Sequence, residues 1–131
     1  MLLGFKKQFV QPILVGTKIL TLRKPRKVKP KIGETLYMYT ALRTKHCQHI
    51  TSAHTLKSVQ QVSISILADD ENECYKIICI IDGKTMTYAK VKKLAVLDGF
   101  KNVTEWMHYW LDGKDSVSEL LEMYHWTHLK F

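Results

Sequence analysis

Hydrophobic and polar residues alternate in short segments along this chain, and glycine, proline and acidic residues separate the segments. Alternation with a period of two predicts half-buried strands, because successive side chains of a strand point to opposite faces. A continuous apolar run predicts a strand buried on both faces, and Asp82-Gly83 is a favoured pair for a hairpin turn. On these grounds strands are predicted at residues 19–23, 35–42, 59–67, 74–81 and 84–87, and an acidic turn at 69–72.

Apolar residues at helical spacing mark one short early segment and the last third of the chain. Gly16 follows the early segment and predicts a glycine C-cap. Asn102 precedes one of the late segments and predicts an N-cap. The predicted helices span residues 9–15, 90–97, 103–111 and 116–123, and a last strand is predicted at 125–131.

This order of elements predicts an α+β fold in which mostly antiparallel strands form a small barrel. We expect about five to seven strands, with one short early helix and two to three late helices. A chain of 131 residues has the usual size of one domain, and no repeat or linker divides it. The prediction is therefore a single domain over residues 1–131.

Membrane and export signals are weak in this sequence. The longest apolar run, residues 77–81, is far shorter than the roughly 20 residues that cross a bilayer. Lys6 and Lys7 interrupt the apolar N-terminus before a signal peptide can form. Three cysteines, an odd number, do not indicate a secreted disulfide framework. We therefore expect a cytoplasmic protein with reduced thiols and no membrane partner.

Metal and cofactor motifs are also lacking in the sequence. His46-Cys47-Gln48-His49 has no second ligand pair at zinc spacing, and no glycine-rich phosphate loop or dinucleotide fingerprint occurs. No metal and no cofactor are therefore predicted.

The net charge of +8 is unevenly distributed along the chain. Residues 1–57 hold twelve Lys and Arg with one acid, Glu34, whereas residues 58–131 hold eight basic and eleven acidic residues. Such asymmetry indicates an anionic partner, with nucleic acid or a nucleotide as the first choice and a membrane surface as the second. The predicted phosphate-binding residues are Arg23, Lys24, Arg26, Lys27, Lys29, Lys31, Arg43 and Lys45.

Arg23 lies on the same predicted strand face as Thr21. Its guanidinium either points into a cleft, where its planar fork suits phosphate or a base edge, or pairs with a late acid such as Asp98. Aromatic side chains could add stacking faces for an unpaired base, although most aromatics at these spacings belong to a core. The candidates for base stacking are Tyr37, Tyr39 and Trp106, followed by Tyr109 and Trp110.

Three segments share the pattern of a known family. Residues 9–23 combine an apolar helix, a glycine, a lysine and Thr-Leu-Arg, and residues 33–36 read Gly-Glu-Thr-Leu, with Arg43 after the strand that follows. Residues 95–100 read Ala-Val-Leu-Asp-Gly-Phe. Together, in this order and over nearly the whole chain, these segments resemble the ASCH domain family, a branch of the PUA-like barrels.

The resemblance implies a β-barrel with a cleft at one end that recognises RNA or a nucleotide. Some members of the family are enzymes, including a ribonuclease and small bacterial amidohydrolases that deacetylate acetylated cytidine with a Lys, a Thr and a Glu. The Lys and the Thr match Lys18 and Thr21, and the Glu falls opposite Asp98, which is one methylene shorter. A misplacement of about 1 Å can lower a rate about 100-fold.

If the cleft is catalytic, Thr21 is the nucleophile or positions a water, Lys18 activates it or stabilises an oxyanion, and Asp98 orients the lysine. The competing interpretation is structural: a surface Lys18, a strand-forming Thr21 and an Asp98 that ends a helix before Gly99. The leading prediction is a monomeric domain that binds RNA or a modified or single-stranded nucleotide in a cleft lined by Lys18, Thr21, Arg23, Arg43 and Asp98. A hydrolase at the same cleft is the alternative, and a protein-interaction domain for an acidic partner is a weaker one.

Overall fold

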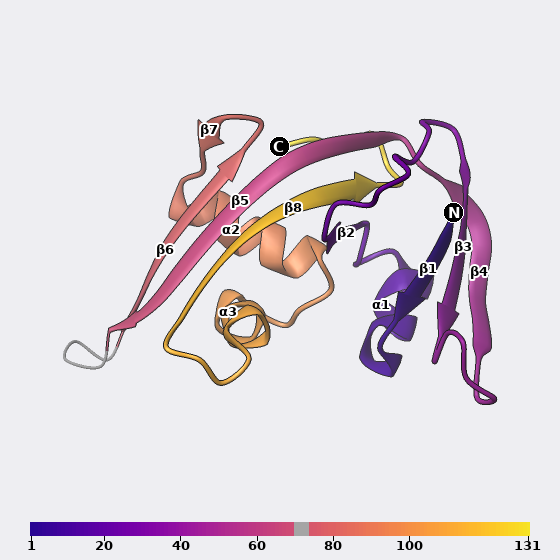
Figure 1. Ribbon diagram of the computed structural model, residues 1–131, viewed down its shortest axis with the longest axis horizontal. Coiled ribbons are helices and arrows are strands. Elements are labelled where there is room, and N and C mark those ends of the chain that lie inside the picture. The colour runs from indigo at the N-terminus through magenta and orange to yellow at the C-terminus, as the bar shows by residue number, and fades with distance from the viewer. Residues whose placement is uncertain (70–73) are drawn as a thin grey trace.

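A computed structural model of the protein describes residues 1–69 and 74–131 as an α+β fold (Figure 1). Most of the acidic turn predicted at 69–72 lies outside the described residues. The strands are β1 (Leu2–Phe5), β2 (Leu20–Arg23), β3 (Thr35–Thr40), β4 (Gln48–Thr55), β5 (Ser58–Asp69), β6 (Cys74–Ile81), β7 (Lys84–Thr85) and β8 (Ser116–His125). The helices are the 3₁₀ turn η1 (Lys7–Phe9), α1 (Val10–Val15), α2 (Tyr88–Leu97) and α3 (Val103–Leu111).

The described strands form two sheets. One has the order β1-β3-β4, with β1 parallel to β3, and the other has the order β2-β8-β5-β6-β7 with antiparallel neighbours throughout. Helices α2 and α3 lie along one side of the long curved ribbon of β5, β6 and β8 (Figure 1). The mostly antiparallel α+β class is confirmed. Neither strand order closes on itself, so a closed barrel stays a prediction.

Most of the predicted turns and caps are confirmed. Gly16 ends α1 with a φ of 85°, in the left-handed region where glycine is favoured. Asp82 and Gly83 both have positive φ, 49° and 79°, as a tight hairpin turn requires. The side chain of Asn102 accepts a hydrogen bond from the Glu105 amide and so caps α3.

The C-terminal third differs most from the prediction. Residues 116–123, predicted as a helix, belong to strand β8, which pairs with both β5 and β2. Apolar residues at 117, 120, 121 and 124 have helical spacing, but hydrogen bonds to two neighbouring strands outweigh this local preference. The strand predicted at 125–131 does not form. Strand β8 ends at His125, the first residue of that range, and no strand follows it among the described residues.

Three further differences concern strands. The prediction lacks β1, which joins the small sheet by pairing with β3. It also lacks β4, which pairs with the other side of β3, so the described residues form eight strands rather than five to seven. Strand β6 is buried on one face only, since Cys74 and Ile78 are exposed whereas Cys79 and Ile81 are buried. An apolar run therefore does not by itself distinguish a strand buried on both faces from a half-buried one.

One hydrophobic core fills the space beneath both sheets. Ile64 of β5, Leu94 of α2 and Trp106 of α3 have no exposed surface. Each side chain of this size contributes about 1.5–3 kcal/mol by leaving water. Within this core α3 packs against α2 and β8.

His125, at the end of β8, is buried and belongs to a hydrogen-bond network that extends through the buried Gln60 to the exposed Asp82. Its Nε2 donates to Gln60 Oε1 over 2.9 Å, and the Gln60 amide nitrogen donates to Asp82 Oδ2 over 2.9 Å. Because a carboxylate only accepts, Asp82 fixes the orientation of the Gln60 amide and hence the Nε2–H tautomer of His125. Burial, together with the positive charge of Lys130, lowers the pKa of His125 to about 4.

This network predicts an acid-sensitive fold. Unfolded His125 takes up a proton near its ordinary pKa of 6.5, whereas the folded residue does so only near 4, so stability falls as pH falls between these values. Between pH 7 and pH 5 the loss is about 2 kcal/mol. Urea unfolding at a series of pH values measures it. We expect His125→Asn to flatten this dependence and His128→Asn, at an exposed position, to retain it; an unchanged pH profile in His125→Asn would contradict the prediction.

Candidate functional site

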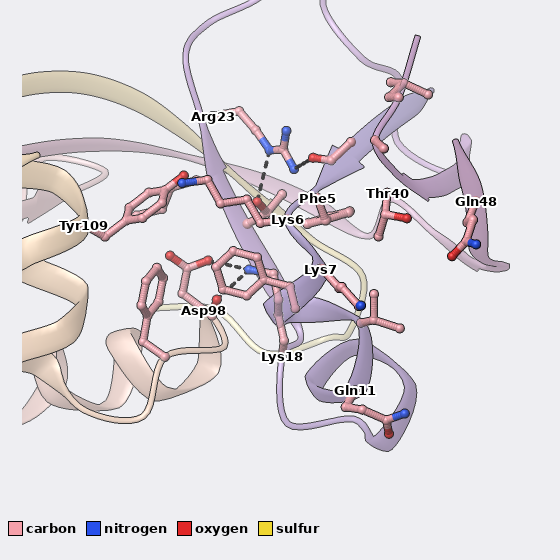
Figure 2. Close-up of a pocket in the computed structure, with 18 of the residues that line it drawn as sticks. Phe5, Lys6, Lys7, Gln11, Lys18, Arg23, Thr40, Gln48, Asp98 and Tyr109 are labelled. Atoms are coloured by element: carbon pink, nitrogen blue, oxygen red, sulfur yellow. Dashed lines mark hydrogen bonds and ion pairs between the residues drawn. The ribbon is translucent and has the colours of Figure 1, made fainter. Parts of the chain in front are cut away.

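A cleft of about 910 Å³ is lined by residues of β1, η1, β2 and the end of α3, by residues that follow α2, and by the β3–β4 connection (Figure 2). Its lining includes four residues predicted from the sequence: Lys18, Thr21, Arg23 and Asp98. Lys18 follows the glycine cap of α1, and Asp98 follows the last residue of α2. A hydrogen bond of 3.0 Å from the Ile19 amide to the Leu97 carbonyl holds these two chain segments together.

Lys18 and Asp98 form a buried ion pair. Lys18 Nζ lies 2.7 Å from Asp98 Oδ1 and 2.6 Å from the Asp98 backbone carbonyl oxygen. Trp106 Nε1 donates to the other carboxylate oxygen over 3.2 Å. The two residues are 2% and 4% exposed, so the structural interpretation with Lys18 on the surface is wrong. Asp98 does end α2 before Gly99, and it holds Lys18 as well.

The surroundings of this pair favour uncharged side chains. Burial lowers the pKa of Lys18 from its ordinary value, with Arg23 acting in the same direction and Asp98 opposing it. Burial likewise raises the pKa of Asp98, which Lys18 opposes. The Lys18 ammonium also lies 4.7 Å from the ring centre of Phe9 and 5.6 Å from that of Phe5, at distances typical of cation–π contacts. A lysine whose pKa is lowered gives up its proton more readily than a lysine in water, which favours a role in proton transfer.

Thr21 and Arg23 share one face of β2, as predicted. Arg23 Nε donates to Thr21 Oγ1 over 3.1 Å, and its Nη2 donates to the Gly4 carbonyl over 2.7 Å. The guanidinium carbon lies 4.7 Å from the ring centre of Phe5. None of the ion pairs among the described residues joins Arg23 to Asp98. Arg23 lines the cleft, and the alternative of an ion pair with Asp98 is not formed.

The cleft also contains residues that the sequence did not single out. Lys6 and Lys7 come from the turn after β1, and Lys6 Nζ lies 4.8 Å from the ring centre of Tyr109. Figure 2 shows Tyr109 on one side of the Lys18–Asp98 pair and Thr40 on the opposite side. The sequence feature that could have indicated them is the pair of lysines directly after the apolar residues 1–5. Their place in the cleft depends on the pairing of β1 with β3, which the prediction lacks.

The prediction that Trp106 stacks on a base is wrong. Its ring has no exposed surface, because it packs in the core and donates its indole N–H to Asp98. Tyr37 and Tyr39, on β3, do not line the cleft; Tyr37 is exposed, and Tyr39 packs edge-on against His49 with ring centres 5.2 Å apart. Of the aromatics considered from the sequence, Tyr109 lines the cleft, with 39% of its surface exposed.

The basic loop after β2 lies outside the cleft. Arg26 Nη2 donates to the Leu2 carbonyl over 2.8 Å, and Lys29 Nζ forms an ion pair of 3.1 Å with the buried Glu122 carboxylate. These contacts fasten two of its cations to the fold. The prediction that Arg43 lines the cleft is wrong, because Arg43 is exposed in the β3–β4 connection and lies outside the lining. The predicted cations that are exposed and do not line the cleft are Lys24, Arg26, Lys27, Lys29, Lys31, Arg43 and Lys45, and their role in phosphate binding stays a prediction.

Gly99 is the residue against which the buried lysine packs. Its φ is 93°, and an added Cβ would lie 2.9 Å from Lys18 Cδ and 3.0 Å from Phe9 Cδ1. We expect Gly99→Ala to lower the free energy of unfolding by about 2–4 kcal/mol, from left-handed strain and overpacking together. Gly16→Ala is the matched control, since Gly16 has a φ of 85° with open space around it, and we expect a loss of about 1 kcal/mol. Equal losses in urea unfolding would contradict this packing.

Three observations concern other classes of site. Among residues 1–69 and 74–131, no group of three His, Cys, Asp or Glu side chains is placed to hold a metal ion. Within the same residues no helix has both the length and the apolar character needed to cross a membrane. The three cysteines, Cys47, Cys74 and Cys79, are free thiols.

No family model, no curated protein and no solved structure matches this chain. The resemblance to the ASCH family therefore rests on the three sequence segments alone.

Proposed function

We propose that this protein is an ASCH-type domain with a PUA-like fold that binds RNA or a nucleotide in the cleft at Lys18, Thr21 and Arg23. The observation that carries the proposal is that residues far apart in the sequence meet in one cleft. Lys18 and Asp98, 80 positions apart, are in direct contact, and the Thr21–Arg23 pair lines the same cavity. These are the positions at which the sequence resembles the family.

The dimensions and chemistry of the cleft support a nucleotide ligand. Its volume of about 910 Å³ falls within the range of about 300–1,000 Å³ found for small-molecule sites. Arg23, Lys6 and Lys7 supply positive charge, and Tyr109 supplies an aromatic ring for a base. Free thiols at all three cysteines are in keeping with a reducing compartment such as the cytoplasm.

Binding to single-stranded RNA tests the proposal. We expect a short labelled RNA of mixed sequence to bind saturably in fluorescence anisotropy. If the three cleft cations contact phosphates, the logarithm of the affinity falls with the logarithm of the salt concentration at a slope of about −2. Absence of saturable binding to RNA and to mononucleotides would overturn the proposal, and binding to an acidic protein instead would favour the interaction-domain alternative.

A hydrolase is the second candidate, and the buried Lys18 favours it. A lysine with a lowered pKa beside a carboxylate, in the same cleft as a threonine hydroxyl, has the components for adding water to an amide or ester. Thr21 is held by Arg23, and no described hydrogen bond joins it to Lys18. Incubation with acetylated cytidine tests this activity. Release of acetate and cytidine that Lys18→Ala abolishes would support a hydrolase, and absence of turnover on both acetylated cytidine and labelled RNA would remove it.

A further inference from the structure

The floor of the cleft, formed by Lys18, Thr21, Arg23 and Asp98, is dominated by hydrogen-bond donors. Arg23 Nε donates to Thr21 Oγ1, and because an arginine never accepts, the Thr21 hydroxyl remains free to donate its own proton. The Nη1 group of Arg23 has no hydrogen-bond partner within the described residues. Both carboxylate oxygens of Asp98 already accept hydrogen bonds, from Lys18 and Trp106. A ligand group at this floor is therefore expected to present acceptors.

The charge of the floor leads to the same conclusion. Lys18 and Asp98 sum to zero whether the shared proton lies on the amine or on the carboxylate. Arg23 keeps its charge in either case, because a guanidinium does not lose its proton in proteins. Asp98 is the one acidic residue in the described lining of the cleft, so the floor retains one uncompensated positive charge, with Lys6 and Lys7 adding to it at the mouth.

From this donor set and charge we propose that Thr21 and Arg23 form an anion subsite that takes the terminal phosphate of a nucleotide, with the nucleoside toward Tyr109 at the mouth. This inference rests on the proposed nucleotide-binding function and specifies which part of the ligand lies deepest in the cleft. The guanidinium fork and a hydroxyl donor match the oxygens of a phosphate.

The depth of the subsite selects a terminal phosphate over an internal one. Thr21 is only 4% exposed, and in the same cleft Lys18 is only 2% exposed, with its ammonium against the rings of Phe5 and Phe9. An internal phosphodiester would have to carry a nucleoside on each side into the cleft, whereas a terminal phosphate carries only one, so a floor of buried residues favours the terminal phosphate. A terminal phosphate attached to a single nucleoside occurs both in a free mononucleotide and at an RNA end that carries a phosphate.

Calorimetric titration of a nucleoside and its 5′- and 3′-monophosphates into the protein tests the subsite. We expect the preferred monophosphate to bind wild type at least about tenfold more tightly than the nucleoside, as charge-assisted hydrogen bonds provide. Arg23→Lys keeps the charge but removes the fork, and Thr21→Val removes the hydroxyl at similar volume. Either variant is expected to lower the ratio of the two affinities, and Thr104→Val, on the exposed face of α3, is expected to preserve it.

The outcomes separate the subsite from the proposed function. The subsite is wrong if nucleoside and monophosphate bind wild type equally, or if the ratio of their affinities is unchanged in both Arg23→Lys and Thr21→Val. If wild type still binds RNA in that case, the proposed nucleotide binding stands. If neither RNA nor any nucleotide binds, both proposals fail. Comparison of RNA with and without a terminal phosphate distinguishes the two sources of the phosphate. Tighter binding of the phosphorylated RNA than of the mononucleotide identifies an RNA end, and equal binding identifies the mononucleotide.

Discussion

Replacing Asp98 with asparagine is expected to lower the free energy of unfolding by about 3–5 kcal/mol, because it leaves the buried Lys18 ammonium without a counter-charge. The pair is 2% and 4% exposed, with Nζ and Oδ1 2.7 Å apart. A loss of this size is a large part of the roughly 5–15 kcal/mol that stabilises a domain. Urea unfolding of wild type and variant at pH 7 measures it.

The double variant Lys18→Met with Asp98→Asn is the control for this prediction. It removes both charges, so we expect it to regain much of the stability that the single variant loses. A single-variant loss below about 1 kcal/mol is the size expected for a solvent-exposed ion pair. Such a result would show that the pair is not buried as described.

Replacing Arg23 with alanine is expected to weaken RNA or nucleotide binding by about 10- to 100-fold, the range for losing hydrogen bonds from a charged group. The change removes the guanidinium that holds Thr21 and faces the cleft. Fluorescence anisotropy with labelled single-stranded RNA measures the effect.

Arg43→Ala is the matched control, since Arg43 is exposed and lies outside the cleft. We expect it to change RNA affinity by less than about threefold, as an exposed charge at the edge of a binding surface would. Equal losses in Arg23→Ala and Arg43→Ala would indicate diffuse binding to the basic half of the chain rather than binding in the cleft.

Much of the fold and the centre of the site could be predicted from the sequence. Glycine at 16 and Asp82-Gly83 occupy positions where backbone conformation is decided locally, so these turns follow from residue type alone. Lys18, Thr21 and Asp98 meet in one cleft, as the resemblance to the ASCH family led us to expect. Arg23 shares a face with Thr21 because the period of a strand fixes it.

What the sequence could not supply depends on long-range pairing. Strand β8 has a helical apolar pattern, and only its pairing with β5 and β2 makes it a strand. Lys6 reaches the cleft because β1 pairs in parallel with β3, and parallel pairing leaves no local turn signal. Trp106 and Tyr109 lie one turn apart on α3, and tertiary packing decides that Trp106 is in the core and Tyr109 lines the cleft.

The structure also shows that basic residues close together in the N-terminal half have different surroundings. Arg26 and Lys29 contact the fold, through the Leu2 carbonyl and Glu122, whereas Arg23 lines the cleft. A run of basic residues in a sequence therefore does not locate a binding site by itself, because some of its members have structural partners.

Mapping of amide chemical shifts during titration with single-stranded RNA tests most directly whether the cleft is the binding site. We predict the largest perturbations at residues 5–7, 18–23 and 98–100 and at Tyr109, which border the cleft from four parts of the chain. Perturbations confined to residues 24–31, with the cleft unchanged, would contradict this account and place RNA on the basic loop instead.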